Sequence, residues 1–536
     1  MNKIFAIDIE QENENIRFSE DKTLINNYVS DESGIILGSA ERVYFPTNEY
    51  QIIQIIKECN KIKKKVTISG GGTGITGSRV PLGGVIIAMD EFTEIHRKPK
   101  SNEKILKKEY LGKTYSIIIG YDEDKGEYYA IAPPGIPLKV LNKMLENEDL
   151  FYPPDPTEQN AFLGGTVATN ASGARTFHFG TTRDYIRRIR IVLPTGEIIN
   201  VEREKYKVID WKFYIVYPNG KEVKFELPHY NLPKLKKNSA GYYIKKDMDL
   251  IDLFIGSEGT LGVFTEIEIK LLSKPKIIYP FYSMFLTEFD AINFVKKLKS
   301  IAYEMEDKII SIEFFDENSV NIAKKIYPEI INKEAKAIIF FEIMSNDEEK
   351  LMKNLSKINE IIERFNPITS LLLDVDKAKE IRHSIPKSVN EFVRKQGLHK
   401  VATDIAVPEE SFNEMYNYYH KIGKESNILY VIFGHIGDFH LHFNFLPKNE
   451  VELKKALEYC TLLLKKAIEL GGTPTAEHGI GKKKYVENGK EKPIIDLIYD
   501  KETIRQLISI KKSIDPNLIL NIGNIIPEEY YLKFIS

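Results

Sequence analysis

Two short stretches near the C-terminus gather side chains suited to metal or acid–base chemistry. The first, G-H-I-G-D-F-H-L-H-F-N, holds three of the ten histidines within eight residues: His435, His440 and His442. The second places a carboxylate and an imidazole side by side, Glu477 and His478, in a glycine-flanked turn. Two imidazoles and one carboxylate with open positions are a common pattern for a divalent metal. The alternative interpretation is a polar sheet face whose histidines are hydrogen-bonded within the protein.

The residues around the histidines predict two strands joined by a tight turn. The apolar run Val431 to Phe433 leads into a Gly-His-x-Gly-Asp turn that carries His435, and a second strand follows. Because side chains alternate along a strand, we expect His440, His442 and Asn444 to share one face. The residues between them are apolar and belong on the other face.

A glycine-rich stretch near the N-terminus predicts a loop that binds phosphate groups. The strand Val66 to Ile68 runs into a segment with five glycines in eight residues, 70–77. Backbone amides in such a loop can form a concave nest for anions. Gly72, Gly74 and Gly77 match G-x-G-x-x-G, but the NAD fingerprint needs a helix at the third glycine. Pro81 follows too closely for one, so we reject that interpretation.

Three more stretches of small residues follow within 200 residues, at 153–175, 180–184 and 253–262. A nicotinamide cofactor usually needs one such loop. Four at strand ends indicate an extended ligand contacted repeatedly.

Composition bounds the remaining possibilities. A chain of 536 residues suits two or three domains, and 75 basic against 77 acidic residues give no net basic character for nucleic-acid binding. Two cysteines, Cys59 and Cys460, cannot ligate an iron–sulfur cluster by themselves. The N-terminus lacks a signal-like apolar segment, and no long uncharged apolar stretch occurs. We therefore expect a cytoplasmic protein.

Patterning divides the chain into parts. Residues 1–37 are polar and predict a lead-in arm. A strand–helix–strand unit follows, with Thr47 as expected N-cap of a helix ending near Lys61. The charged, hairpin-like residues 97–129 resemble an insertion. After Pro275, alternating apolar helices and strands predict a second α+β domain.

The motifs G-G-G-T-G-I-T-G, P-P-D-P-T, G-G-T-V-A-T-N-A-S-G-A-R, G-T-T-R-D and I-G-S-E-G-T-L-G occur in this order. They resemble the FAD-binding domain of the vanillyl-alcohol oxidase and para-cresol methylhydroxylase (PCMH) superfamily, in the branch of D-lactate, glycolate and D-2-hydroxyglutarate dehydrogenases. The resemblance implies an α+β fold with a two-lobed FAD-binding domain (38–275), an antiparallel-sheet cap domain that binds substrate (276–490) and a C-terminal segment returning to the flavin (491–536). Members of the family that bind FAD covalently carry a histidine in these glycine loops. No histidine lies in 70–77 or 164–173, so the resemblance implies noncovalent FAD.

The same resemblance implies roles for individual residues. His435, His442 and Glu477 would bind a divalent metal (zinc, manganese or iron), and His478 would be the general base. Arg382 and Lys400 would grip the substrate carboxylate, and Asn444 would join the catalytic group, with the roles of His440 and His383 left open. The implied FAD contacts are Gly70, Gly71, Gly72, Thr73, Gly74, Gly77, Ser78, Pro154, Asp155, Thr157, Gly164, Gly165, Ala168, Ser172, Gly173, Thr182, Arg183, Gly256, Glu258, Gly259, Gly262 and Asn521.

The activity implied is oxidation of a D-2-hydroxy acid, most simply D-lactate, to the 2-keto acid by metal-assisted hydride transfer to flavin. An external acceptor would then take the electrons: an electron-transferring flavoprotein, an iron–sulfur subunit, a quinone or a cytochrome. Glycolate and D-2-hydroxyglutarate are competing substrates, and a homodimer is one possible assembly. A flavoenzyme like the alkyl-glycerone-phosphate synthases and a non-catalytic flavin subunit of an electron-transfer complex are competing hypotheses for the function.

Overall fold

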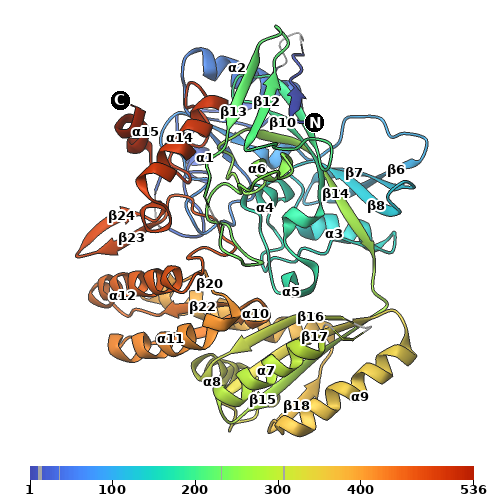
Figure 1. Ribbon diagram of the computed structural model, residues 1–536, viewed down its shortest axis with the longest axis vertical. Helices are drawn as coiled ribbons and strands as arrows, with labels where there is room; N and C mark the ends of the chain where they lie inside the picture. The colour runs from blue at the N-terminus through green and yellow to red at the C-terminus, as the bar shows by residue number, and fades with distance from the viewer. Residues whose placement is uncertain (10–14, 35–36, 231, 303, 306–307, 536) are drawn as a thin grey trace.

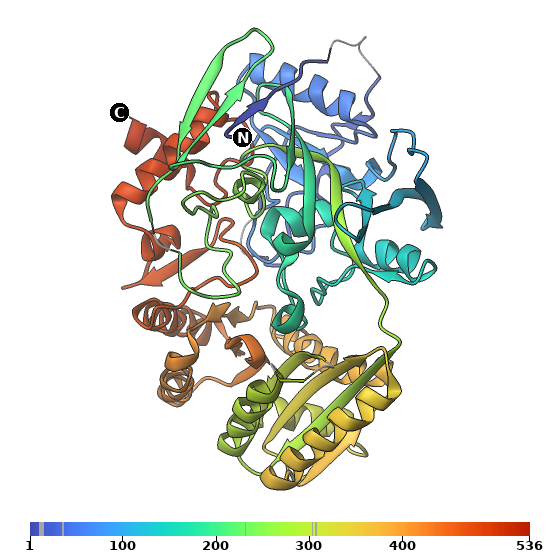
Figure 2. The same cartoon turned by 45° about the vertical axis from the view of Figure 1, so that its right-hand side comes forward.

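The structure is a computed structural model that describes residues 1–9, 15–34, 37–230, 232–302, 304–305 and 308–535. Two bodies are stacked along the long axis, and both views separate them (Figures 1 and 2). The upper body contains the N-terminal half of the chain and the last, red segment. The chain passes to the lower body between β14 (Val263–Ser273) and β15 (Ile277–Phe285), and it returns after α12 (Glu450–Glu469).

A four-stranded sheet in the upper body carries the glycine loop. Its order is β2-β3-β5-β4, and the last three strands are parallel: β3 (Arg42–Tyr44), β5 (Val85–Ala88) and β4 (Val66–Ser69). The connecting helix α2 (Glu49–Lys61) begins one residue later than expected. Asn48, not Thr47, is its N-cap, because the Asn48 side chain accepts a hydrogen bond from the Gln51 amide.

No helix follows the glycine loop. The chain from residue 70 to 84 turns back on itself and enters β5 directly, with Gly72 and Gly77 at positive φ. A helix at Gly77 is what a dinucleotide fingerprint requires. The expected absence of a helix after Gly77 is therefore confirmed.

The hairpins at 97–129 are not an insertion, contrary to the expectation from their charge. The strands β6 (Glu103–Tyr110), β7 (Lys113–Asp122) and β8 (Glu127–Ala132) belong to a seven-stranded sheet of order β11-β10-β14-β8-β7-β6, with β9 (Leu150–Phe151) paired to β14. Charged residues dominate the edge strand β6, whereas Ile117 to Ile119 in β7 are buried. The other partners are β10 (Ile186–Val192) and β11 (Ile198–Glu202).

The N-terminal residues are more than a lead-in arm. Strand β1 (Lys3–Phe5) pairs in parallel with β12 (Lys212–Val216), which pairs with β13 (Glu222–Glu226). Strand β2 (Phe18–Ser19) pairs with β3, and α1 (Lys22–Ile25) follows. Residues 10–14 and 35–36 of the predicted arm lie outside the described residues.

The lower body is the antiparallel α+β domain that was expected. Its eight-stranded sheet runs β18-β15-β17-β16-β21-β22-β19, with β20 paired to β22. The strands are β18 (Thr369–Leu372), β17 (Ala337–Ser345), β16 (Lys308–Phe315), β21 (Tyr430–His435), β22 (His440–Phe445), β19 (Val401–Ala402) and β20 (Ile405–Ala406). Apolar residues of α7 (Glu288–Ala302) and α9 (Glu348–Phe365) share one core with this sheet, and those of α8 (Glu317–Ile326) and α10 (Val375–Lys395) share another.

The remaining helices, together with the two-stranded sheet β23-β24, lie outside the larger sheets. These are α3 (Leu138–Glu146), α4 (Leu163–Thr169), α5 (Thr176–Phe179), α6 (Ile251–Phe254), α11 (Phe412–Ser426), β23 (Lys484–Glu487), β24 (Lys490–Pro493), α13 (Ile495–Ile498), α14 (Lys501–Ile514) and α15 (Glu528–Ile535). After α14, Leu520 bridges to Val66 at the start of β4, so the C-terminal segment lies against the strand that carries the glycine loop. Among the described helices, none combines the length and apolarity needed to cross a bilayer.

Candidate active site

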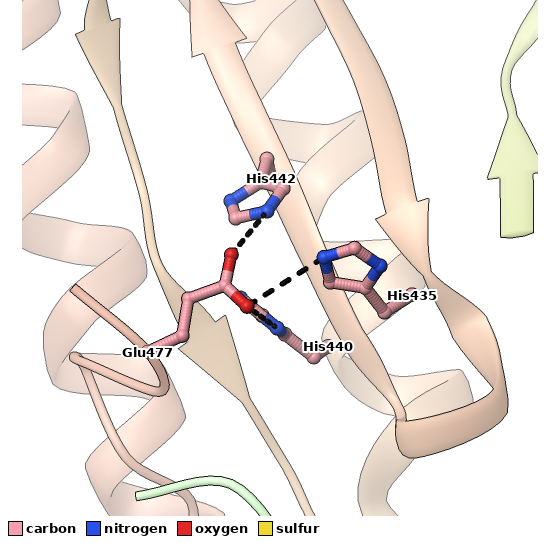
Figure 3. Close-up of side chains that lie close together, drawn as sticks. All are labelled: His435, His440, His442 and Glu477. Atoms are coloured by element: carbon pink, nitrogen blue, oxygen red, sulfur yellow. Dashed lines mark ion pairs between the residues drawn. The ribbon is translucent and has the colours of Figure 1, made fainter. Parts of the chain in front are cut away.

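Four side chains converge where β21 and β22 meet the turn after α12 (Figure 3). His435 ends β21 rather than hanging in the turn as predicted, and His440 and His442 share one face of β22 as expected. Glu477 Oε1 lies 3.4 Å from His442 Nε2. Its Oε2 lies 3.6 Å from His435 Nε2 and 3.8 Å from His440 Nδ1. The opposite face of β22 is apolar and packs under α11, where the rings of Phe443 and Tyr419 meet.

Two of the histidines present a free nitrogen to this cluster. His435 Nδ1 lies 2.6 Å from Glu313 Oε1, and His442 Nδ1 lies 3.2 Å from the Thr403 carbonyl oxygen. Each partner is an acceptor, so the Nδ1 atoms carry the hydrogens and the Nε2 atoms offer lone pairs. Burial alone would raise the pKa of Glu313, but the contact with His435 and the charge of Arg382 lower it to about 2. A metal-binding histidine is usually held by such a second partner.

His440 is oriented the other way round. Its Nε2 lies 2.9 Å from Asp404 Oδ1, and its Nδ1 faces the Lys237 ammonium at 3.4 Å. The same ammonium lies 3.1 Å from Glu477 Oε2, and the Lys237 side chain is fully buried. Burial opposes ionisation of Glu477, yet Lys237 and the imidazoles hold its pKa well below the usual range. Glu477 therefore stays a carboxylate, as a metal ligand must.

His478 lies at the open edge of the cluster. Its Nδ1 is 3.2 Å from Asp404 Oδ2 and its Nε2 is 3.4 Å from Glu477 Oε1, and 27% of the side chain is exposed. The Asp404 carboxylate also accepts the backbone amide of His478 at 2.9 Å. Burial would raise the pKa of Asp404, but His478 and His440 hold it well below its usual range. This pairing leaves Nε2 of His478 as the proton-accepting atom, the arrangement of a general base.

The donor set fits a divalent cation. The candidate ligand atoms of His435, His440, His442 and Glu477 all lie within 4.8 Å of one another. Ligand atoms that each lie about 2 Å from one metal ion are separated from one another by distances in this range. The Nε2 atoms of His435 and His442 and the Glu477 carboxylate have the required lone pairs. The candidate ligand atoms of a second group, Asp404, Glu477 and His478, lie equally close together. There, however, Nδ1 of His478 contacts Asp404.

One cavity of about 1100 Å³ contacts both this cluster and the glycine loop. Of the described hydrogen bonds, none has a backbone amide of residues 71–76 as its donor. These amides are available to an anion, as a phosphate nest requires. A Cβ built on Gly165 would meet no other atom within 4 Å, so that glycine borders open space. Cavity size and free amides both fit a ligand with the length and phosphates of FAD.

The cavity separates the predicted FAD contacts into two groups. Those that line it are Gly70, Gly71, Gly72, Thr73, Gly74, Ser78, Thr157, Gly164, Gly165, Ala168, Ser172, Glu258, Gly259, Gly262 and Asn521. Those outside its lining are Gly77, Pro154, Asp155, Gly173, Thr182, Arg183 and Gly256.

Several residues of the outer group support the cavity wall. Arg183 is buried and donates to the carbonyl oxygens of Asp252 and Ile255. A Cβ on Gly173 would clash with the Asp155 carbonyl at 2.0 Å, so this glycine permits close backbone packing. Glu258, in the lining group, is also held internally: it accepts from Ser78 and from the amides of Ile480 and Gly481. It links the glycine loop to the turn after His478.

The predicted substrate-binding residues also face the cavity. Arg382 on α10 uses Nε to contact Glu313 at 3.2 Å. Within the described chain, its two terminal nitrogens have no hydrogen-bond partner. Lys400 has neither a hydrogen bond nor an ion pair among the described residues, and burial lowers its pKa to about 8. Asn444 donates to the His442 carbonyl oxygen and borders the same cavity, as does His383.

Three residues of the site were missed by sequence reasoning: Asp404, Glu313 and Lys237. Glu313 had a visible signal, because it is the only charge inside the apolar run Ile309 to Phe315. Asp404 stands between small and apolar residues in V-A-T-D-I-A-V, next to the predicted Lys400. Lys237 lies in an irregular segment of the upper body and gave no signal.

Comparisons with known proteins agree with this architecture. Residues 40–105 and 113–202 match the FAD binding domain family, and residues 285–525 match the C-terminal domain of FAD linked oxidases. A D-lactate dehydrogenase of Anaerostipes hadrus is 28% identical over 491 residues, covering 89% of this chain and 88% of the relative. One from Archaeoglobus fulgidus is 27% identical, with 90% of each chain covered. The mitochondrial D-2-hydroxyglutarate dehydrogenase of Danio rerio is 26% identical, with 92% and 80% covered.

Solved structures share the fold. A 4-ethylphenol oxidase from Gulosibacter chungangensis, in complex with isoeugenol, superposes with a TM-score of 0.64 at 16% identity, covering 96% of this chain and 95% of the other. An alkyldihydroxyacetonephosphate synthase gives a TM-score of 0.60 at 16% identity, with 94% and 82% covered.

The two domain matches and the glycine-lined cavity define the chain as an FAD-linked oxidoreductase of the PCMH type. Within this class it is similar to D-lactate dehydrogenases, a glycolate oxidase subunit and a D-2-hydroxyglutarate dehydrogenase.

Proposed function

We propose that this enzyme oxidises a small D-2-hydroxy acid, with D-lactate the first candidate, to the corresponding 2-keto acid and passes the electrons to an external acceptor. The observation that carries the proposal is that the His–Glu cluster and the glycine loop border the same cavity. A substrate on the cluster could thus meet a flavin lying along the loop. The names of the relatives support the substrate class.

In the overall reaction the substrate loses a proton from its hydroxyl oxygen and a hydride from C2. Loss of both converts the C–O bond into the C=O bond of the keto acid. FAD, held noncovalently along residues 70–74 and 164–165, would accept the hydride. A divalent cation on His435, His442 and Glu477 would polarise the hydroxyl and carboxylate oxygens. Zinc, manganese and iron all suit these ligands.

The chain's own residues have separate tasks in this scheme. His478 Nε2 takes the hydroxyl proton, while Asp404 holds the ring and stabilises its cationic form. The terminal nitrogens of Arg382 can pair with the substrate carboxylate in the planar geometry that a guanidinium favours. Lys400 adds a second positive charge to the same cavity. Asn444 borders the same cavity, where its amide oxygen could accept a hydrogen bond from the acid.

The two electrons that a bound flavin would accept would have to leave to an acceptor outside the chain. The chain has two cysteines, Cys59 and Cys460, which are too few to ligate an iron–sulfur cluster. We propose an electron-transferring flavoprotein, an iron–sulfur subunit, a quinone or a cytochrome as acceptor.

Anaerobic mixing with D- and L-2-hydroxy acids tests the proposal. A D-acid should bleach the oxidised-flavin absorbance in a single turnover, with the keto acid formed in equal amount to the flavin reduced. Bleaching by no acid, in a protein shown to contain FAD and metal, would refute the proposed activity.

A further inference from the structure

The lysine at the centre of the cluster comes from the other body of the molecule. Lys237 lies between β13 and β14, whereas the histidines and Glu477 lie in the chain from β21 onward. Its neighbour Ser239 donates its amide to the Thr475 carbonyl at 3.0 Å and its hydroxyl to the Ala476 carbonyl at 3.2 Å. The backbone next to Lys237 is therefore fastened to the segment that carries Glu477. This fixes the ammonium inside the cluster.

Hydrogen-bond chemistry determines what Lys237 does to His440. An ammonium only donates, so His440 Nδ1 at 3.4 Å must accept, and the ring hydrogen must sit on Nε2, facing Asp404. Both nitrogens of His440 are then engaged. His435 and His442 have the opposite tautomer, because Glu313 and the Thr403 carbonyl take their Nδ1 hydrogens. Their Nε2 atoms remain available.

We propose that Lys237 keeps His440 out of the metal's ligand set. This inference rests on the metal centre proposed above and concerns how many protein ligands it has. Four protein ligands close a tetrahedral site, whereas three leave positions open for other oxygens. Two histidines and one carboxylate with open positions are the arrangement that a chelating hydroxy acid needs. By occupying Nδ1 of His440, Lys237 leaves room at the metal for the hydroxyl and carboxylate of the substrate.

The geometry makes His440 a real competitor in the absence of Lys237. His440 Nδ1 lies 3.8 Å from Glu477 Oε2, nearly the same as the 3.6 Å from His435 Nε2 to that oxygen. The His440 ring is fully buried. Without the Lys237 ammonium, the lone pair of its Nδ1 would be available to a metal. Lys237 is thus a positioning residue that sets the coordination number without itself touching the metal or the substrate.

Co²⁺ is the probe, because its absorption is much stronger in a tetrahedral site than in a five- or six-coordinate one. The full-length protein with FAD bound is loaded with Co²⁺, and the flavin spectrum is subtracted. Wild type should give the spectrum of a site with three protein ligands completed by water. Lys237→Met should give a shifted and more intense spectrum, because an imidazole replaces bound water, and should bind Zn²⁺ tighter by about tenfold or more, the scale of effects produced by groups just outside a metal's ligands.

Two further variants make the test specific. Lys237→Met combined with His440→Asn should restore the wild-type spectrum, because the additional ligand is gone. Lys236→Met is the matched control: Lys236 donates to the Phe177 carbonyl outside the cluster, so its loss should change neither spectrum nor affinity. A Lys237→Met spectrum like that of wild type would overturn the proposal, as would an altered spectrum that persists in the double variant.

His440→Asn alone provides a test that does not depend on the folding of the lysine variant. If His440 is outside the ligand set, this variant keeps the wild-type Co²⁺ spectrum and stoichiometry, and a lost or altered spectrum would overturn the proposal. A wild-type protein that binds no Co²⁺ would refute the metal centre together with this inference. One that binds Co²⁺ but oxidises no hydroxy acid would refute only the proposed activity.

Discussion

Oδ2 of Asp404 lies 3.2 Å from Nδ1 of His478 and also accepts the backbone amide of that histidine at 2.9 Å. Two contacts from one carboxylate oxygen fix both the ring and the turn that carries it. The other oxygen, Oδ1, holds His440 at 2.9 Å. A single buried aspartate therefore orients two imidazoles, and each of the following predictions depends on this arrangement or on the cavity beside it.

Replacement of His478 by alanine should slow anaerobic flavin reduction by about 10²–10⁴-fold, the usual range for loss of a general base. Metal content should stay near that of wild type, because His435, His442 and Glu477 are intact. Single-turnover kinetics with metal analysis of the same sample measure both. A variant that reduces flavin at the wild-type rate would eliminate His478 as the base and make His440 the next candidate.

Asp404→Asn tests the orientation of His478. The amide retains the shape of the carboxylate but loses its charge, so a protonated His478 is no longer stabilised and the rate of flavin reduction should fall. Metal content should stay near that of wild type, because Asp404 is not among the proposed ligands. If the aspartate only supports the fold, the melting temperature would drop while the folded variant reduces its flavin at a rate near that of wild type.

His435→Ala and His442→Ala should each lose divalent metal and nearly all turnover but retain FAD. The glycine loop follows β4 in the upper body, a different part of the chain from the strands β21 and β22 that carry these histidines, so the substitutions leave its amides unchanged. Elemental analysis and the flavin spectrum give the two stoichiometries. Unchanged metal in both variants would contradict the ligand assignment.

The pKa of Lys400, lowered by burial to about 8, predicts a pH dependence of substrate binding. The ammonium that attracts a carboxylate is present below that pKa and is lost as the pH rises through it. KM for the acid should therefore increase above about pH 8 in wild type. Lys400→Arg keeps its charge at any such pH, so its KM should stay flat. A wild-type KM that stays constant well above that pKa would contradict a contact between Lys400 and the acid.

Arg382→Ala should weaken substrate affinity more than it slows flavin reduction at saturation, because an ion pair with the carboxylate persists into the transition state. Arg382→Lys retains the charge but not the planar fork, and it should recover only part of the affinity. A large drop in the saturating rate with unchanged affinity would assign Arg382 a different role.

Sequence reasoning succeeded where a pattern is local. The strand alternation that places His440 and His442 together, the absence of a helix after Gly77 and the α+β second domain all follow from short-range periodicity. It failed where charge concealed a buried strand: in the hairpins at 97–129 the edge strand is charged, but Ile117 to Ile119 are core residues. Asp404, Glu313 and Lys237 reach the site from separate segments, and only the folded chain brings them together.

We propose that one cavity holds a flavin and a metal-assisted site for a D-2-hydroxy acid. Stopped-flow reduction of the purified, metal-replete protein by D-lactate, with L-lactate as the matched control, tests this proposal. We expect rapid loss of oxidised-flavin absorbance with the D-acid, little with the L-acid, and loss of the reaction in His442→Ala, which still contains FAD. A His442→Ala protein, free of metal, that reduces its flavin as fast as wild type would contradict it.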